Sequence, residues 1–107
     1  MTSLAGSSND PKPITSNEQW EQVAIKATHT KLVVAFFWAE FHEPSKRGGQ
    51  MDTVFSALAN KNENVVFLKV EAPVLPDVTS KYPISSVPTF IFIRNGKLLG
   101  KFLSRYR

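Results

Sequence analysis

Residues 31–38 (KLVVAFFW) decide the fold class of this 107-residue chain. The stretch is a continuous apolar run rich in β-branched and aromatic residues, and such a run is typical of a strand that is buried on both faces of a sheet. Strands of this kind form the centre of α/β sheets, where helices cover both faces. The sequence therefore indicates an α/β protein, with further strands and helices on both sides of this run.

The segment before this strand predicts an edge strand and a helix. Residues 1–12 (MTSLAGSSNDPK) are small, polar and turn-prone, and we expect a flexible lead-in there, followed by one domain over residues 13–107. Residues 13–15 are the candidate strand. Ser16 and Gln19 form a capping-box pattern at the start of the helix. One face of that helix is apolar and consists of Trp20, Val23, Ala24 and Ala27.

The segment after the central strand predicts two more helices and three more strands. A helix from residue 51 has one apolar face, made of Met51, Val54, Phe55, Leu58 and Ala59. Residues 64–71 (NVVFLKVE) are typical of a second strand, and residues 76–82 of a short helix. Residues 89–103 predict a hairpin around Asn95-Gly96, because both turn positions tolerate positive φ.

This order of elements predicts the topology of the sheet. The sequence reads βαβαβαββ and has no internal repeat. Strands joined through a helix are expected to be parallel, because the crossover returns the chain to the same end of the sheet. The two-residue turn makes the last two strands antiparallel. We therefore expect a mixed sheet flanked by helices in a three-layer α/β sandwich.

The composition excludes several kinds of site. Hydrophobic residues make up 42% of the chain and charged residues 21%, which is typical of one globular domain with a real core. The chain has no cysteine, which excludes disulfides, thiolate catalysis and cysteine-ligated zinc or iron–sulfur clusters. The two histidines, His29 and His42, are too few for a typical zinc site. We expect neither a metal nor another cofactor.

The charge pattern bears on partners and location. The net charge is +4, and no acidic residue follows Asp77. The basic residues of this part are not clustered with exposed aromatic residues, so we interpret them as a solvated end of the domain and do not expect a nucleic acid as partner. No apolar run approaches the roughly 20 residues of a membrane span, and residues 1–12 lack a signal-peptide pattern. We expect no membrane association and a cytoplasmic location, with the nucleus as the second compartment.

Two motifs carry a resemblance to a known family. Residues 37–46 (FWAEFHEPSK) are similar to the thioredoxin active-site stretch, with His42 at the position of the nucleophilic cysteine and Ser45 at that of the resolving cysteine. Residues 85–90 (SSVPTF) resemble the cis-proline loop and the strand that follows it. The resemblance covers about residues 13–103 and implies a thioredoxin-like fold. Thioredoxins carry a helix after the final hairpin, and we expect that helix to be missing from this chain.

A narrower resemblance concerns one branch of this family. Residues 50–59 (QMDTVFSALA), Lys81-Tyr82 and residues 84–90 (ISSVPTF) are together similar to the N-terminal thioredoxin-like domain of PICOT-type multidomain monothiol glutaredoxins. The glutaredoxin domains of that family carry a CGFS motif that binds an iron–sulfur cluster, and this chain has no such motif. Residues 47–49 (RGG) resemble an insertion near the start of the second helix.

The thioredoxin-like site lacks the parts that thioredoxin chemistry needs. Thiol–disulfide exchange requires an attacking thiolate and a second sulfur. The resemblance instead gives His42 and Ser45 at these positions, and Phe36 at that of the buried acid that moves protons. We therefore expect no catalytic residue. A hydrolytic Ser–His pair is not expected either, because it needs an orienting carboxylate and an oxyanion hole. We interpret His42 as an exposed loop residue.

The resemblance also implies a partner-binding surface around the proline loop. It implies a cis Val87–Pro88 bond and main-chain pairing of an extended partner peptide beside that bond. Aromatic side chains next to a concave loop are common anchors for partners. The residues expected to contact the partner are Trp38, Phe41, His42, Val87 and Pro88. For Trp38, packing in the core is an equal alternative.

Together these features predict a docking domain without redox activity, and not an enzyme. By resemblance, its partners would be protein kinase C or factors of iron homeostasis and iron–sulfur assembly. Three alternatives stay open: a phosducin-like assembly domain, a thioredoxin-type oxidoreductase whose cysteines were removed, and an RNA-binding domain that uses its basic end.

Overall fold

The computed structural model describes residues 9–26, 31–42, 45–46, 48–82, 84 and 86–103. The elements in chain order are β1 (Lys12–Ile14), α1 (Asn17–Trp20), the π-helical segment η1 (Glu21–Lys26), β2 (Leu32–Trp38), α2 (Gln50–Lys61), β3 (Val66–Glu71), the 3₁₀ turn η2 (Ala72–Val74), α3 (Pro76–Lys81), β4 (Thr89–Arg94) and β5 (Lys97–Leu103). None of the helices in this described part is long and apolar enough to cross a membrane.

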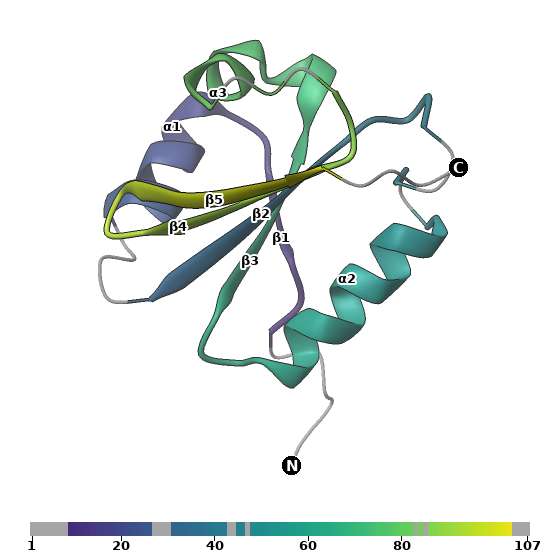
Figure 1. The fold of residues 1–107 in the computed structure, drawn as a ribbon, viewed down its shortest axis with the longest axis horizontal. Coiled ribbons are helices and arrows are strands. Elements are labelled where there is room, and N and C mark those ends of the chain that lie inside the picture. Colours follow the sequence, from purple (N-terminus) through teal and green to yellow (C-terminus); the bar gives the residue numbers. More distant parts are fainter. Residues whose placement is uncertain are drawn as a thin grey trace.

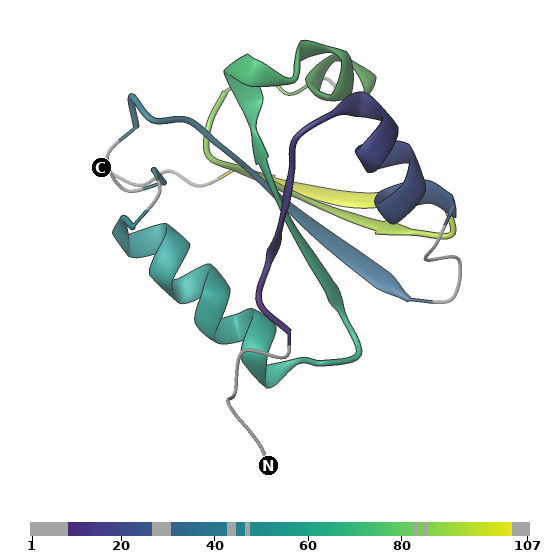
Figure 2. The same cartoon turned by 180° about the vertical axis from the view of Figure 1, so that it is seen from behind.

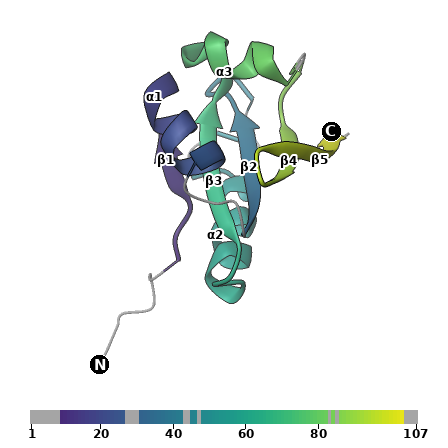
Figure 3. The same ribbon diagram turned by 90° about the vertical axis from the view of Figure 1, so that its left-hand side faces the viewer.

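The strands form one mixed sheet in the order β1-β3-β2-β4-β5, which Figure 3 shows across its width. Strands β1 and β2 pair with β3 in parallel, and β4 pairs with β2 and β5 in antiparallel orientation. Helix α2 covers one face, whereas α1, η1 and α3 lie on the other (Figure 1). The predicted α/β fold class with a mixed sheet between helices is confirmed. Within the described residues, no helix follows β5.

Strand β2 lies in the middle of the sheet and joins two hydrophobic cores. Residues 33–38 are all buried, as the apolar run predicts, and alternate side chains point to opposite faces. Phe37 packs against Trp20 of α1, with ring centroids 6.1 Å apart. Phe36 points the other way, packs against Phe55 of α2 and stacks on Phe90 of β4, with centroids 5.1 Å and 4.8 Å away. The strand therefore fixes both helical layers to the sheet.

The first helix starts as predicted and then changes its hydrogen-bonding register. The Ser16 hydroxyl accepts from the backbone N–H of Gln19 at 3.0 Å, and the Gln19 side chain accepts from the N–H of Thr15 at 2.7 Å. From Glu21 onward the segment is π-helical, with bonds to the fifth residue instead of the fourth. The predicted apolar residues Trp20 and Ala24 are fully buried, and Ala27 lies outside the described residues.

The domain begins earlier than the predicted boundary at residue 13. The side-chain amide of Asn9 donates at 2.7–3.2 Å to three backbone carbonyls, that of Ala59 in the last turn of α2 and those of Asn62 and Val65 between α2 and β3. Lys12, which the sequence assigns to the lead-in, belongs to β1. Figure 2 shows β1 starting beside the C-terminal end of α2. Residues 9–12 are therefore part of the domain, because Asn9 bonds to the end of α2 and to the turn that follows it, and Lys12 pairs with β3.

Helix α2 is covered by the sheet on only part of its apolar side. Phe55 and Ala59 are buried against the sheet, as predicted. Val54 and Leu58 are predicted on the same face, but their side chains are 52% and 48% exposed. The reason is the position of the helix: α2 overlaps β3 and β2 in Figure 3, whereas β4 and β5 extend beyond it. The side of α2 toward β4 and β5 meets no other described helix.

Candidate functional site

The candidate site lies at the carboxyl end of β2, in the loop that leads to α2. The backbone N–H groups of Ser45 and Lys46 both donate to the carbonyl of His42, at 3.0 and 2.9 Å, and so form a tight turn. The Ser45 side chain is fully buried in this turn. Its hydroxyl oxygen lies 2.8 Å from Nδ1 of the His42 ring and donates to the His42 carbonyl at 3.3 Å. The two residues that stand at the cysteine positions of thioredoxin, His42 and Ser45, are therefore in direct contact.

This contact corrects the interpretation of His42 as an exposed loop residue. The ring is half-buried, because the turn brings its side chain onto that of Ser45. Among the described residues, no carboxylate is hydrogen-bonded to the His42 ring, and Glu43 lies outside them. The described part of the loop therefore lacks the orienting group of a hydrolytic triad. The pair closes the turn by satisfying the polar atom of a buried serine.

The position of the buried acid is filled by an apolar ring. Phe36 is fully buried and packs against Phe55 and Phe90. A phenyl ring neither holds nor transfers a proton. Since the sequence also contains no cysteine, this chain cannot carry out thiol–disulfide exchange by itself.

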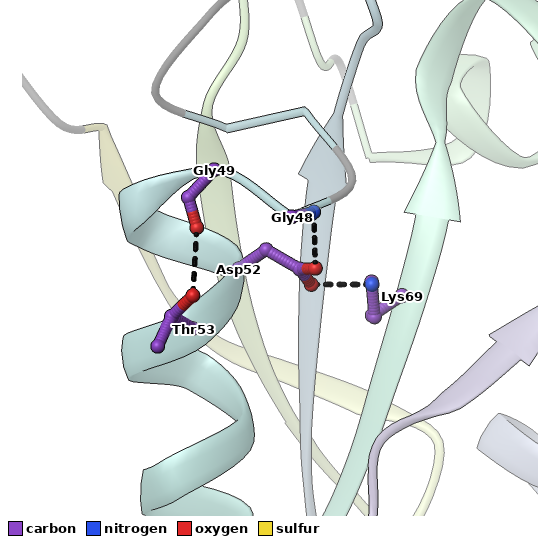
Figure 4. Close-up of polar contacts among 5 residues, drawn as sticks. All are labelled: Gly48, Gly49, Asp52, Thr53 and Lys69. Carbon is purple, nitrogen blue, oxygen red and sulfur yellow. Dashed lines mark hydrogen bonds and ion pairs between the residues drawn. The ribbon is translucent and has the colours of Figure 1, made fainter.

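A polar cluster anchors the end of the same loop to the sheet (Figure 4). Asp52, in the first turn of α2, forms an ion pair with Lys69 of β3 and accepts a hydrogen bond from the backbone N–H of Gly48 at 2.8 Å. The two side chains are only 16% (Lys69) and 13% (Asp52) exposed. Lys69 Nζ also lies 5.7 Å from the centre of the Trp38 ring, within range of a cation–π interaction. The Thr53 hydroxyl donates to the Gly49 carbonyl at 3.1 Å. These contacts hold the start of α2 against β3.

The sequence analysis missed this cluster, although one signal was present. Lys69 interrupts the apolar run of residues 65–70, and a lysine at such a position needs a partner. Asp52 stands in the first turn of α2, where a carboxylate is favoured by the helix dipole. The pairing itself depends on how α2 crosses β3, which is a long-range feature of the fold.

The proline loop before β4 forms the second part of the site. The Val87–Pro88 bond is cis, as predicted. Pro88 is buried, Val87 is half-buried, and the Thr89 hydroxyl donates to the Ser86 carbonyl at 2.8 Å. Val87 lines a shallow groove together with Phe41, whose side chain is 77% exposed. The other residues along this groove are Ala72, Pro73, Thr79, Ile84 and Ser86.

The structure separates the five predicted partner-binding residues into different environments. Phe41 and Val87 line one groove. The His42 ring contacts Ser45, and Pro88 is buried and does not line the groove. Trp38 is only 5% exposed and belongs to the core under α2, which favours the core alternative stated for it. Phe41 and Val87 are therefore the two side chains of the set that are available to a partner at the same place.

Comparisons with known proteins agree with the fold and with the geometry of the site. The thioredoxin family model matches residues 12–105. Thioredoxin H1 of Arabidopsis thaliana is 39% identical over 85 residues, which cover 78% of this chain and 72% of that protein. Glutaredoxin-3 of Mus musculus is 40% identical over 82 residues, which cover 77% of this chain and 23% of that protein. The chain thus spans about a quarter of the length of the glutaredoxin-3 relatives it matches.

Solved structures give the same result. The crystal structure of Schistosoma mansoni thioredoxin superimposes with a TM-score of 0.79 at 27% sequence identity, and the match covers 96% of this chain and 89% of that one. The matches to glutaredoxin-3 confirm the narrower resemblance to the PICOT-type branch. This chain belongs to the thioredoxin family, as a thioredoxin-like domain of the kind found in PICOT-type monothiol glutaredoxins.

Proposed function

We propose that this chain is a redox-inactive docking domain that binds an extended segment of a protein partner along the groove between Phe41 and Val87. The observation that carries the proposal is the placement of an exposed aromatic side chain beside the cis-proline loop, in a site whose cysteine positions hold His42 and Ser45. The chemistry of the family is lost, whereas the concave surface next to it is kept.

The groove has the composition of a peptide-binding surface. Phe41 offers a large apolar area to solvent, and Ala72, Pro73 and Ile84 supply apolar walls. Interfaces gain most of their affinity from a few such anchors. An extended segment would place one side chain against Phe41 and use main-chain hydrogen bonds at the proline loop, the mode in which strands are recognised along an exposed backbone.

The site also has features that suit binding rather than turnover. The Ser45 hydroxyl is buried and bonded within its own turn, so it offers no reactive group to a bound segment. Next to Phe41, the backbone N–H groups of Ser45 and Lys46 both bond to the His42 carbonyl. Backbone that is held by such bonds loses little conformational entropy when a partner binds.

We further propose that the docking serves a PICOT-type protein, with protein kinase C or iron-homeostasis factors as partners, in the cytoplasm or the nucleus. The likeness to glutaredoxin-3 supports this step. It concerns relatives of which this chain spans about a quarter, so the partner must be identified by experiment.

The experiment compares partners recovered from cells by the wild-type chain and three variants. Phe41→Ser and Val87→Asp change the groove. Leu98→Ser is the matched control, because Leu98 is an exposed apolar residue of β5 outside the groove. We expect both groove variants to lose the same proteins, identified by mass spectrometry, while Leu98→Ser retains them. Equal recovery by all four chains would refute the groove as the docking surface.

A further inference from the structure

A hollow on the α2 side of the sheet lies beside β1, toward the carboxyl ends of β2 and β3, and has a volume of about 390 Å³. We call it the β1–β3 hollow, and its lining includes Pro11, Pro13, Thr15, Trp38, Lys69 and Glu71. Small-molecule sites have volumes of roughly 300–1,000 Å³. In open α/β sheets, ligands bind at the carboxyl ends of the strands. The size and the place of this hollow therefore suit a small ligand or one side chain of a partner.

The register of the sheet brings the walls of this hollow together. Glu71 lies opposite Trp38, and Pro13 lies opposite Lys69. Lys69 and Glu71 are two positions apart in β3, so their side chains point to the same face. On that face Lys69 contacts Asp52 of α2 (Figure 4). Strand β1 is the edge of the sheet next to β3 (Figure 3), and the hollow therefore lies at this edge.

The hollow holds one carboxylate without a counter-charge. Lys69 forms its ion pair with Asp52, so these two charges offset each other. Among the described residues, none forms a hydrogen bond or an ion pair with the Glu71 side chain. Lys12 alternates with Pro13 along β1, so its side chain points to the opposite face. The hollow therefore has a net negative charge and complements a cation.

The remaining walls are apolar and fixed before any ligand binds. Pro11 and Pro13 present their rings, and proline side chains have no rotamer entropy to lose. Trp38 is held in the core under α2. The Thr15 hydroxyl donates to the side-chain oxygen of Gln19 at 3.0 Å. A site with fixed walls loses little conformational entropy on binding.

The chemistry of the walls selects the kind of cation. In the part of the chain that the structure describes, no group of three or more acidic or histidine side chains could hold a metal ion. A guanidinium, by contrast, forms two parallel hydrogen bonds to a single carboxylate. It is also planar and weakly hydrated, so it packs against flat apolar groups, and its alkyl stem lies along apolar surface. One carboxylate between proline and tryptophan walls matches this group.

We propose that the β1–β3 hollow binds an alkyl guanidinium, the group that arginine carries. Its N–H groups donate to the Glu71 carboxylate, and its alkyl stem packs on Pro11 and Pro13. Free arginine derivatives and an arginine of an extended partner segment offer the same chemistry. The hollow shares no residue with the Phe41–Val87 groove, so this proposal and the docking proposal can fail independently.

The test is a titration of the isotope-labelled 107-residue chain, followed by amide chemical shifts in NMR spectra. The probes are the acetylated amides of arginine, norleucine and glutamate, and a serine–glycine peptide with a single arginine. We expect the arginine amide to bind in the millimolar range and to shift the signals of Thr15, Trp38 and Glu71. It should bind about tenfold more tightly than the norleucine amide, which lacks the charge. The glutamate amide should leave these signals unchanged.

The peptide distinguishes the two sources of the guanidinium. Tighter binding of the arginine peptide than of the arginine amide would identify a partner segment as the ligand, because the peptide adds contacts beside the hollow. Equal binding of the two would identify a small arginine-type molecule. Binding of either probe should weaken as the salt concentration rises, because ions screen the charge of Glu71.

Variants of the chain locate the binding. Glu71→Gln removes the charge but keeps the shape, and it should weaken binding of the arginine amide about tenfold. Glu63→Gln is the matched control, since Glu63 is an exposed glutamate in the turn before β3, at the other end of that strand. Lys69→Met leaves the charge of Asp52 without its partner beside the hollow and should therefore tighten binding. Circular dichroism verifies that each variant is folded.

Several results would overturn the proposal. Equal binding of the norleucine amide would show that the charge is not recognised. Unchanged binding in Glu71→Gln, or weaker binding in folded Lys69→Met, would place the cation elsewhere. Shifts confined to Phe41 and Val87 would assign the arginine to the docking groove. The absence of any saturable shift in the millimolar range would remove the site.

Discussion

The ion pair of Lys69 and Asp52 is expected to stabilise the packing of α2 on β3, and its contribution to the free energy of unfolding can be measured. Lys69→Met removes the cation but keeps a side chain of similar length, and Asp52→Asn removes the charge of its partner. An exposed ion pair contributes about 0–1 kcal/mol, whereas removing one partner of a fully buried pair costs about 3–5 kcal/mol. With side chains 16% and 13% exposed, this pair lies closer to the buried case.

We therefore expect each single variant to lower the free energy of unfolding by about 2–3 kcal/mol. In Lys69→Met, Asp52 keeps the hydrogen bond from Gly48, which limits the loss. The double variant should lose about the same amount as either single variant, because the second substitution removes a charge that no longer has its partner. The resulting coupling energy is about 2 kcal/mol.

The assay is urea unfolding followed by far-ultraviolet circular dichroism, with a double-mutant cycle over the wild type and the three variants. The control cycle uses Lys81 and Glu21, which also form an ion pair but are each 38% exposed. Its coupling energy should stay below about 1 kcal/mol. Losses at Lys69 and Asp52 that add to within about 0.5 kcal/mol would refute the account of this pair as a buried anchor.

Three further predictions concern the site itself. Ser45→Ala removes the contact with His42 and should lower the free energy of unfolding by about 1 kcal/mol, measured by urea unfolding; no change would mean that the contact does not hold the turn. His42→Cys/Ser45→Cys should form an intramolecular disulfide on oxidation, because these side chains already touch, and two free thiols in a thiol titration would contradict that geometry. Phe36→Asp should cost more than about 3 kcal/mol, because it removes a buried ring and places a carboxyl group in an apolar core; a thermal scan showing wild-type stability would contradict this packing.

Much of the fold could be predicted because its signals are local. The run of apolar residues in β2 is buried along residues 33–38, and the Asn95-Gly96 turn joins β4 to β5, with both residues at positive φ. The cis bond before Pro88 was expected from the resemblance alone. In these cases, the residues that determine the structure lie next to one another in the sequence.

The features that were missed depend on contacts between distant segments. Asn9 caps the end of α2 across some fifty positions of sequence, with separations of 50, 53 and 56 residues. Lys69 meets Asp52 only after α2 has packed on β3. Periodicity predicted one apolar face for α2, but it could not indicate that the sheet covers Phe55 and leaves Leu58 exposed.

Only part of the candidate site could be predicted, because some of its contacts also depend on the folded chain. The sequence indicated the two loops that form the site, the loop after β2 and the proline loop before β4, and Phe41 and Val87 line one groove. The contact between His42 and Ser45 was not expected, because it depends on the backbone bonds that Ser45 and Lys46 donate to the His42 carbonyl. The surroundings of Trp38 could be settled only by the position of α2 above β2.

The most direct test of the docking proposal is site-specific photocrosslinking in cells. A photoreactive phenylalanine analogue replaces Phe41 in one chain and Leu98 in the control chain, both at exposed positions. We predict a discrete protein adduct at position 41 that resists reducing agents, is absent at position 98 and disappears when Val87→Asp is added. Identical adducts at both positions, or an adduct at position 41 that Val87→Asp leaves unchanged, would contradict docking along this groove.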